Sequence, residues 1–296
     1  MKTIILVDSC CDLPRSYLDD NKDHIDVIGM PVIIGNKEYF DDLSLTFVHK
    51  GLYQALRQGV KASTSRINSF RFYDKFKKYV SQGYKVLYMG LSKNMSKTHQ
   101  NALKARKSIL KDYPEAQIYV MNSISASIGL GVLVMKVTDL KKEGADFTTL
   151  CHWIDKHQEA AQHWFMVNNF NFLKRGGRVT TSQAMMGNLL NVKPILTVNG
   201  QGVLETEVNL LGKKKALDYL VTKFKSLVDP SLFDHVILGH GDAIQDIHIL
   251  RDMIQSEMPD LKLMITEFSA TIASHVGPDM LAIGFLGHSR IGLTEG

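Results

Sequence analysis

Four segments of the chain are rich in small hydroxyl-bearing side chains. Three of them, 8–12, 91–98 and 122–127, directly follow short apolar runs, and the fourth, 62–69, precedes a helical pattern. In an open parallel sheet, ligands lie beyond the carboxyl ends of the strands. Hydroxyls, together with the free amides of a helix N-terminus, suit an anionic head group. We therefore expect the four segments to share one rim, although helix capping alone would favour the same residue types.

A basic stretch in the second half also indicates an anionic ligand or partner. Residues 160–204 include no Asp or Glu, although the whole chain has 30 acidic residues. The basic residues of this stretch are Lys174, Arg175, Arg178 and Lys193. This predicts a surface that meets something negative. A glycine pair after Arg175 is equally typical of a capped helix end, where cations are favourable, so that explanation stays open.

The motifs of common hydrolases and nucleotide-binding sites are missing. Asp8 ends an apolar run as a phosphatase nucleophile would, but Cys10 stands where the second acid is expected. Ser96 lacks the flanking glycines of a nucleophile elbow, and no phosphate loop ending in Gly-Lys-Ser/Thr occurs. We expect His275 in a turn, 275–278, before the last strand. A lipid hydrolase or acyltransferase using Ser96 or His275 remains an alternative.

The composition excludes several classes of protein. The 296 residues are 45% hydrophobic and 22% charged, which is typical of a globular chain with room for two domains. A net charge of +5 is too small to indicate a nucleic-acid binder. No apolar run reaches the roughly 18 residues of a membrane span, and no signal-peptide pattern opens the chain. We therefore expect a cytoplasmic protein without stable membrane insertion.

The cysteines and histidines predict neither a disulfide framework nor a metal cofactor. The three cysteines include an adjacent pair, Cys10 and Cys11, which fits a reducing compartment. No Cys/His spacing matches a zinc site. The histidines at 152, 157 and 163 have at best the spacing of helical neighbours.

The hydrophobic pattern predicts an α/β fold in two domains, 1–160 and 161–296. The first has buried runs at 4–7, 85–89 and 117–121 and helical patterns at 71–81 and 98–111, which favour a mostly parallel sheet. The second has apolar runs at 164–167, 193–198, 203–210, 236–239, 262–266 and 280–286 and helical patterns at 170–174, 182–191 and 245–257. The turn 199–202 predicts a hairpin, and the second sheet is expected to be mixed or antiparallel. No linker separates the halves, so they should pack closely around a cleft.

Six motifs, in order along the chain, closely resemble those of the DegV family. They are Asp8-Ser9 with Asp12-Leu13-Pro14, Ser63-Thr64-Ser65, Leu91-Ser92 with Ser96 and Thr98, and the segments 173–178, 189–195 and 275–278. Each motif is weak alone, but six in register over almost the whole chain make a specific signal. The resemblance implies a two-domain α/β protein with a long-chain fatty acid buried between the domains.

The resemblance also implies roles for individual residues. In the family the fatty-acid carboxylate is held by a Thr and a Ser, which match Thr64 and Ser96 here. Ser65 and His275 would belong to the head-group network. Arg178 matches the family's Gly-Gly-Arg arginine, and the hypothesis is that it contacts a kinase partner or steadies the phosphoryl group.

Relatives in Gram-positive bacteria present the acyl chain to a separate ATP-dependent kinase subunit, which makes an acyl phosphate. By this resemblance the chain would carry lipid and do no chemistry alone. A stand-alone lipid sensor is the remaining alternative.

The sequence departs from the family at Arg66-Ile67, at Lys97 and His99, and at Asp279. Thr64, Ser96 and His275 are retained, so these departures bear on chain preference and on the kinase partnership rather than on lipid binding.

Overall fold

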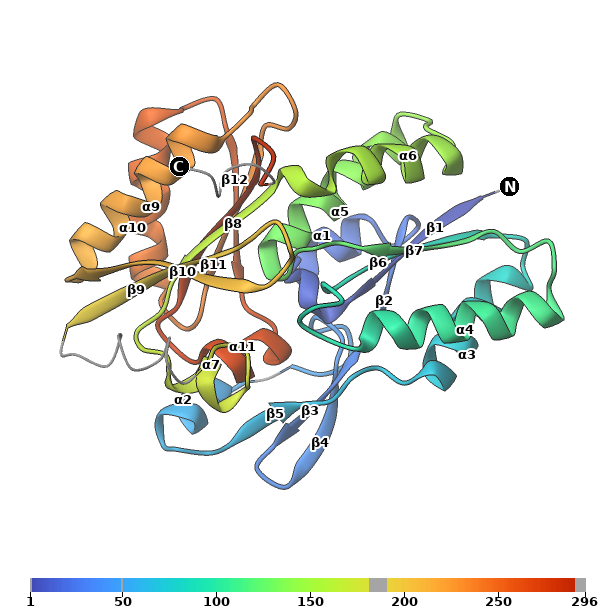
Figure 1. The fold of residues 1–296 in the computed structure, drawn as a ribbon, viewed down its shortest axis with the longest axis horizontal. Coiled ribbons are helices and arrows are strands. Elements are labelled where there is room, and N and C mark those ends of the chain that lie inside the picture. The colour runs from blue at the N-terminus through green and yellow to red at the C-terminus, as the bar shows by residue number, and fades with distance from the viewer. Residues whose placement is uncertain (1, 49, 181–190, 291–296) are drawn as a thin grey trace.

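The computed structural model describes residues 2–48, 50–180 and 191–290 (Figure 1). Within these ranges the chain forms two large sheets, one in each half, and a small third sheet. The sheet of the first half is parallel, and that of the second is mixed. The predicted α/β class and the character of both sheets are therefore confirmed.

The sheet of the first half has the strand order β2-β1-β6-β7. The strands are Ile25–Ile28, Thr3–Asp8, Lys85–Gly90 and Ile118–Asn122. Along β1, Ile4 and Leu6 pack toward helices α3 (Ser69–Val80) and α4 (Thr98–Asp112), whereas Ile5 and Val7 pack on the opposite face. Because both faces are covered, the strand is apolar at every interior position. Helices α1 (Arg15–Asp20) and α6 (Phe147–His157) complete this half.

The sheet of the second half has six strands. Their order is β10-β9-β8-β13-β11-β12, with bounds Leu204–Leu211, Val192–Val198, Ala161–Met166, Leu281–Leu286, His235–His240 and Lys262–Glu267. Neighbouring strands are antiparallel except β11 and β12. The predicted hairpin is confirmed, because β9 and β10 pair around residues 199–203. Helices α9 (Lys213–Leu227) and α10 (Ile244–Glu257) cover the outer face (Figure 1).

Helix α5 (Ser127–Lys142) lies between the two large sheets and belongs to the core of both (Figure 1). It packs on β8, β11 and β13 and also on the short 3-10 helix Ser9–Cys11 that follows β1. Gly131 allows that contact, because a Cβ there would lie 2.6 Å from the Cys11 carbonyl oxygen. One continuous apolar cluster therefore joins the halves, as close packing without a linker predicted.

The third sheet was not predicted. Its order is β4-β3-β5, with bounds Lys37–Asp41, Met30–Ile34 and Ala62–Thr64, and all pairs are antiparallel. Helices α2 (Leu52–Arg57), α7 (Asn171–Arg175) and α11 (Ala270–Val276) pack beside it. The expectation that 62–69 is a loop on the rim of the parallel sheet was wrong, because Ala62–Thr64 pairs with β3 instead.

The predicted elements agree with the described ones to within three residues at each end. The helical pattern at 182–191 lies outside the described residues, apart from Asn191. The division into domains 1–160 and 161–296 stays a prediction; its boundary falls at the 3-10 helix Gln158–Ala160, directly before β8. In the part of the chain that the structure describes, no helix is both long and apolar enough to cross a membrane.

Candidate functional site

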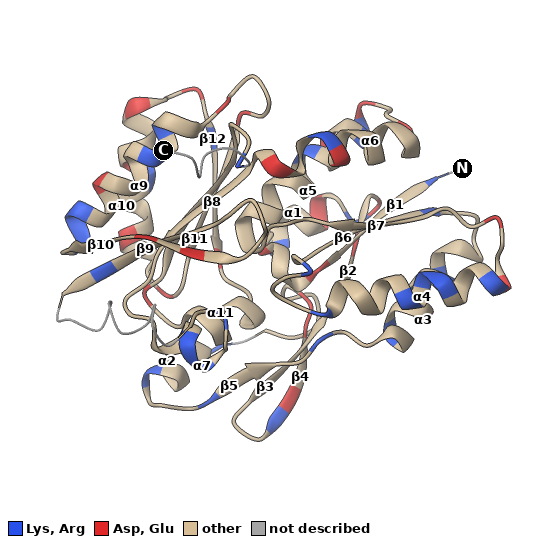
Figure 2. Ribbon diagram, in the orientation of Figure 1, with Lys and Arg blue, Asp and Glu red and all other residues tan. Residues whose placement is uncertain are grey.

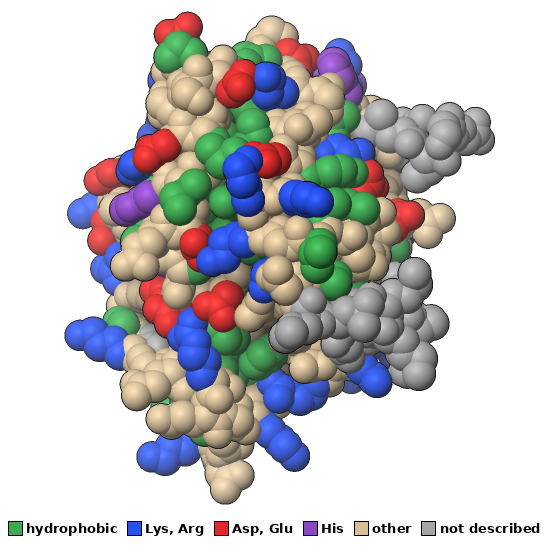
Figure 3. Space-filling view, turned by 90° about the vertical axis from the view of Figure 1, so that its left-hand side faces the viewer, with side chains coloured by type: hydrophobic (Ala, Val, Ile, Leu, Met, Phe, Trp, Pro, Cys, Tyr) green, Lys and Arg blue, Asp and Glu red, His purple; other side chains and the backbone are tan. Residues whose placement is uncertain are grey.

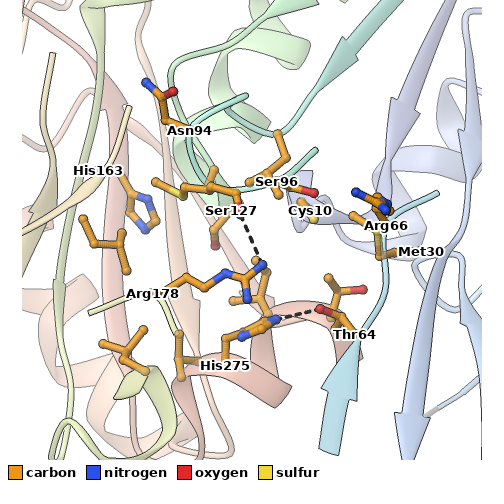
Figure 4. Close-up of a pocket in the computed structure, with 18 of the residues that line it drawn as sticks. Cys10, Met30, Thr64, Arg66, Asn94, Ser96, Ser127, His163, Arg178 and His275 are labelled. Carbon is orange, nitrogen blue, oxygen red and sulfur yellow. Dashed lines mark hydrogen bonds between the residues drawn. The ribbon is translucent and has the colours of Figure 1, made fainter. Parts of the chain in front are cut away.

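A cavity of about 550 Å³ lies where the two halves and the third sheet meet (Figure 4). This volume is within the usual range for small-molecule sites, which is roughly 300–1,000 Å³. The first half contributes Cys10, Met30, Thr64, Ser65, Arg66, Leu91, Lys93, Asn94, Met95, Ser96, Lys97, Ala126 and Ser127. The second half contributes His163, Phe165, Leu173, Arg178, Leu204, Thr271, Ile272, His275, Val276 and Met280.

The lining combines apolar walls with positive charge. Among the described residues that form it there are four cationic side chains, Arg66, Lys93, Lys97 and Arg178, and no carboxylate. Both signs of charge occur on the rest of the described surface (Figure 2), including the face that carries α9 and α10 (Figure 3). A cavity with apolar walls and cationic side chains suits a ligand with an anionic head and an apolar tail.

Thr64 and His275 are brought together from opposite ends of the chain. Thr64 Oγ1 lies 2.7 Å from His275 Nε2 (Figure 4). The prediction that His275 lies in a turn was wrong: helix α11 extends to Val276, and His275 occupies its last turn. Gly176 packs directly on the imidazole, since a Cβ there would lie 2.3 Å from Nδ1. The ring is therefore held by contacts on both of its edges.

The His275 imidazole is neutral at neutral pH. Burial, together with the nearby charge of Arg178, lowers its pKa from 6.5 to about 4. A neutral imidazole has one donor and one acceptor nitrogen, and Nδ1 has no hydrogen-bond partner among the described residues. His275 can thus orient the Thr64 hydroxyl without adding charge to the site.

Ser96 lies in the loop just before helix α4. Its Oγ accepts a hydrogen bond from the Thr98 amide at 3.2 Å and donates one to Thr98 Oγ1 at 2.9 Å. Thr98 is buried, so the partly exposed Ser96 hydroxyl is fixed at the cavity wall. Ser65 also lines the cavity, and its backbone amide bonds to the Pro31 carbonyl at 3.0 Å.

Arg178 is the arginine of the acid-free stretch that lines the cavity. Its guanidinium donates to the carbonyl oxygens of Gly176 and of Met95, the latter at 3.2 Å, and so connects the second half with the 91–98 loop (Figure 4). Burial lowers its pKa below the ordinary arginine value. Lys174 and Arg175, in contrast, are exposed on α7, and Lys193 bonds to Asn168. The stretch therefore supplies one cavity cation and a separate exposed group.

Several hydroxyl and carboxyl groups of the predicted rim are used inside the protein instead. Asp8 accepts bonds from the Tyr88 hydroxyl at 2.7 Å and the Leu91 amide at 3.1 Å. The Ser92 hydroxyl donates to the Gly202 carbonyl at 2.7 Å. Asp12 accepts bonds from the Ser127 hydroxyl and from the Ser269 amide. The expectation that all four segments offer polar groups to one ligand was too broad, because these groups hold the loops in place.

The geometry gives no support to a Ser/His hydrolase. The Ser96 hydroxyl is bonded to Thr98 and His275 to Thr64, so the two side chains are not paired with each other. Among the described residues no carboxylate contacts His275 to orient it. The described residues also contain no cluster of three or more His, Cys, Asp and Glu side chains that could hold a metal ion.

His163 lines the cavity, a position that the sequence did not predict. It lies on β8 and is not a helical neighbour of residues 152 and 157. It shares one face of the strand with Phe165, and the two rings are 5.2 Å apart. Alternation along 161–166 was the signal that could have placed it on the cavity wall.

We expect acid to destabilise the protein through His275. Between pH 6.5 and 4 the unfolded chain binds a proton at this residue that the folded protein does not, so the stabilisation is complete above about pH 6.5 and is lost toward pH 4. The loss in free energy of unfolding between pH 7 and pH 5 should be about 2 kcal/mol smaller in His275→Gln than in the native protein. Urea unfolding at both pH values measures it.

Two comparisons make this measurement specific. Burial raises the pKa of Asp12 to about 7, so Asp12 titrates with the opposite sign, but it does so in both proteins and cancels. His248→Gln, which changes an exposed histidine on α10, should leave the pH dependence as it is. The assignment to His275 is wrong if the native protein and His275→Gln lose the same stability on acidification.

Comparisons with known proteins agree with the six motifs. The model of a family described as uncharacterised, DegV, matches residues 2–288. A DegV domain-containing protein of Clostridium perfringens is 35% identical over 290 residues, covering 98% of this chain and 99% of the relative.

Solved structures share the fold. A DegV lipid-binding protein from Thermotoga maritima has a TM-score of 0.83 and 25% identity, covering 98% of this chain and 100% of that one. The fatty acid kinase B3 protein of Streptococcus pneumoniae, loaded with linoleic acid, has a TM-score of 0.83 and 18% identity, with 97% and 100% covered. Because the family model spans nearly all residues and the Clostridium relative is similar along its full length, this chain belongs to the DegV family.

Proposed function

We propose that this protein binds one long-chain fatty acid in the cavity between its halves. The observation that carries the proposal is the composition of the lining: apolar walls, four cations, and no carboxylate among the described residues. The Thermotoga and Streptococcus structures support it, because they are of a lipid-binding protein and of a protein loaded with linoleic acid. We place the bacterial protein in the cytoplasm, where it would meet free fatty acids.

The apolar walls would supply most of the affinity. An acyl chain with about 15 buried carbons gains roughly 12 kcal/mol at about 0.8 kcal/mol each. Association and ordering of the chain remove several kcal/mol of this gain. The walls include Met30, Leu91, Phe165, Leu173, Ile272 and Met280. The tail would thus determine how tightly the ligand binds.

The head group would determine its orientation. In our proposal the carboxylate accepts hydrogen bonds from Thr64 and from Ser96, whose hydroxyl proton turns from Thr98 Oγ1 to the ligand, each contributing about 1.5 to 3 kcal/mol. His275 orients Thr64, and Ser65 also lines the cavity. Arg178 provides the nearby positive charge. This arrangement uses each residue to which the family resemblance gives a role in the site.

We further propose that the carboxylate is presented to a separate ATP-dependent kinase subunit, which forms the acyl phosphate. The chain lacks a phosphate-binding loop of its own, so the nucleotide chemistry would belong to the partner. The name of the Streptococcus structure, a fatty acid kinase B3 protein, supports this role. In this scheme the protein is a carrier that contributes to phospholipid synthesis and needs no cofactor besides its bound lipid.

Mass spectrometry of the protein purified from cells tests the binding proposal. We expect the native spectrum to show a complex with one fatty acid per chain, and solvent extraction to release a long-chain acid. A protein that is empty when purified and also fails to bind added fatty acids would refute the proposal. The fold would be unaffected by that result.

A further inference from the structure

One polar side chain in the cavity is not used by the proposed head-group site. His163 projects from β8 into the cavity, on the side opposite Thr64 (Figure 4). It is only 2% exposed, yet neither ring nitrogen has a hydrogen-bond partner among the described residues. Buried polar side chains in native proteins are almost always bonded. Two unbonded nitrogens facing a ligand cavity therefore indicate that the ligand supplies the partner.

A second unbonded group lies beside His163. The hydroxyl of Ser125 is buried and has no partner among the described residues. Both side chains border Gly129 on helix α5: a Cβ there would lie 2.6 Å from Ser125 Oγ and 2.9 Å from His163 Cβ. Gly129 thus lets α5 approach β8 closely beside both side chains. His163 lines the cavity, whereas Ser125 is not among the lining residues.

The surroundings of His163 are those of the acyl tail. Its ring lies 5.2 Å from the Phe165 ring, and Leu204 also lines the cavity. Burial and the charge of Arg290 lower the pKa of His163 to about 3, so the ring is neutral. A neutral imidazole offers one donor and one acceptor nitrogen, and a hydroxyl group can bond to either of them, as acceptor or as donor. A carboxylate only accepts, so it could bond to the N–H alone and never to the acceptor nitrogen.

We propose that His163 recognises a hydroxyl group within the acyl chain, so that the preferred ligand of this protein is a hydroxylated long-chain fatty acid. The inference rests on the proposed function and specifies its substrate class. A plain acyl chain would leave both imidazole nitrogens against methylene groups. A chain with its hydroxyl at the right carbon would bond to one of these nitrogens instead.

The test uses delipidated full-length protein and a positional series of ligands. Octadecanoic acid is compared with its mono-hydroxylated derivatives, in which the hydroxyl is moved carbon by carbon, in competition with a bound fluorescent fatty acid. We expect one narrow range of positions to bind about tenfold more tightly than octadecanoic acid. All other positions should bind more weakly, because they place a hydroxyl against apolar walls.

Variants of the protein test whether His163 determines the preferred hydroxyl position. His163→Phe should abolish the preferred position and leave affinity for octadecanoic acid equal or higher. The control Thr64→Ala should weaken all ligands by a similar factor and keep the preferred position, because it acts on the head group. Circular dichroism and melting curves check that each variant is folded.

The outcomes separate the two proposals. If octadecanoic acid binds the native protein at least as tightly as every hydroxylated isomer, the His163 inference is overturned and fatty-acid binding stands; His163 would then bond to water. The inference also fails if the preferred position persists in folded His163→Phe. If no acid in the series binds, the proposed function fails and this inference fails with it.

Discussion

Replacing both Thr64 and Ser96 by alanine should lower the affinity for octadecanoic acid by roughly a hundredfold, without unfolding the protein. The two hydroxyls would each lose a hydrogen bond to a carboxylate, worth about 1.5 kcal/mol or more. Neither side chain is in the core: Thr64 is partly buried at the end of β5, and Ser96 is partly exposed before α4. Competition with a fluorescent fatty acid measures the affinity.

The exposed Ser63 offers a matched control on the same strand. It neighbours Thr64 but does not line the cavity, so Ser63→Ala should bind as the native protein does. The single substitutions should each account for part of the loss. Unchanged affinity in the folded double variant would place the carboxylate elsewhere in the cavity.

Arg178→Gln should still bind octadecanoic acid within about tenfold of the native affinity but support roughly a hundredfold less acyl-phosphate formation with ATP and the kinase subunit. The apolar walls are unchanged, which preserves most of the binding energy. The positive charge beside the carboxylate is lost, and removing one such electrostatic group typically costs a factor of 10² or more in turnover. Binding and phosphorylation are measured on the same loaded preparations.

Arg175→Gln is the matched control for the Arg178 variant. Arg175 is exposed on α7 and does not line the cavity, so its substitution removes the same charge from the surface alone. A larger defect in Arg175→Gln than in Arg178→Gln would make the exposed basic group the kinase contact. If both variants turn over normally, Arg178 has no role in the transfer. Failure of any kinase to accept the native loaded protein would favour a lipid sensor.

The sequence predicted the elements with a clear pattern between polar ends. The strands around residues 4–7 and 85–89 are short continuous apolar runs, the helix at 98–111 has one apolar face, and all three were confirmed. Helix α5 was missed because it has no polar face: it is buried from Ser127 to Met135 by sheets on both sides. The short strands of the third sheet were missed because three to five residues carry too little periodic pattern.

The candidate site could be predicted only in part, for a similar reason. Motif matches indicated Thr64, Ser96, Arg178 and His275, but the contact between Thr64 and His275 depends on β5 lying next to α11. That packing involves residues 211 positions apart and leaves no local pattern. His163 belongs to no motif, and only the alternation of β8 pointed to it.

The shared helix α5 bears on how quickly a bound lipid can be exchanged. Because α5 packs on both large sheets, swinging the halves apart would break the common apolar core and cost a large part of the folding free energy. We therefore expect the acyl chain to leave through local displacement of the loops and of α11 at the cavity. Residence time would then be governed by these local motions and by the length of the chain withdrawn. Dissociation rates should accordingly depend steeply on chain length and weakly on protein stability.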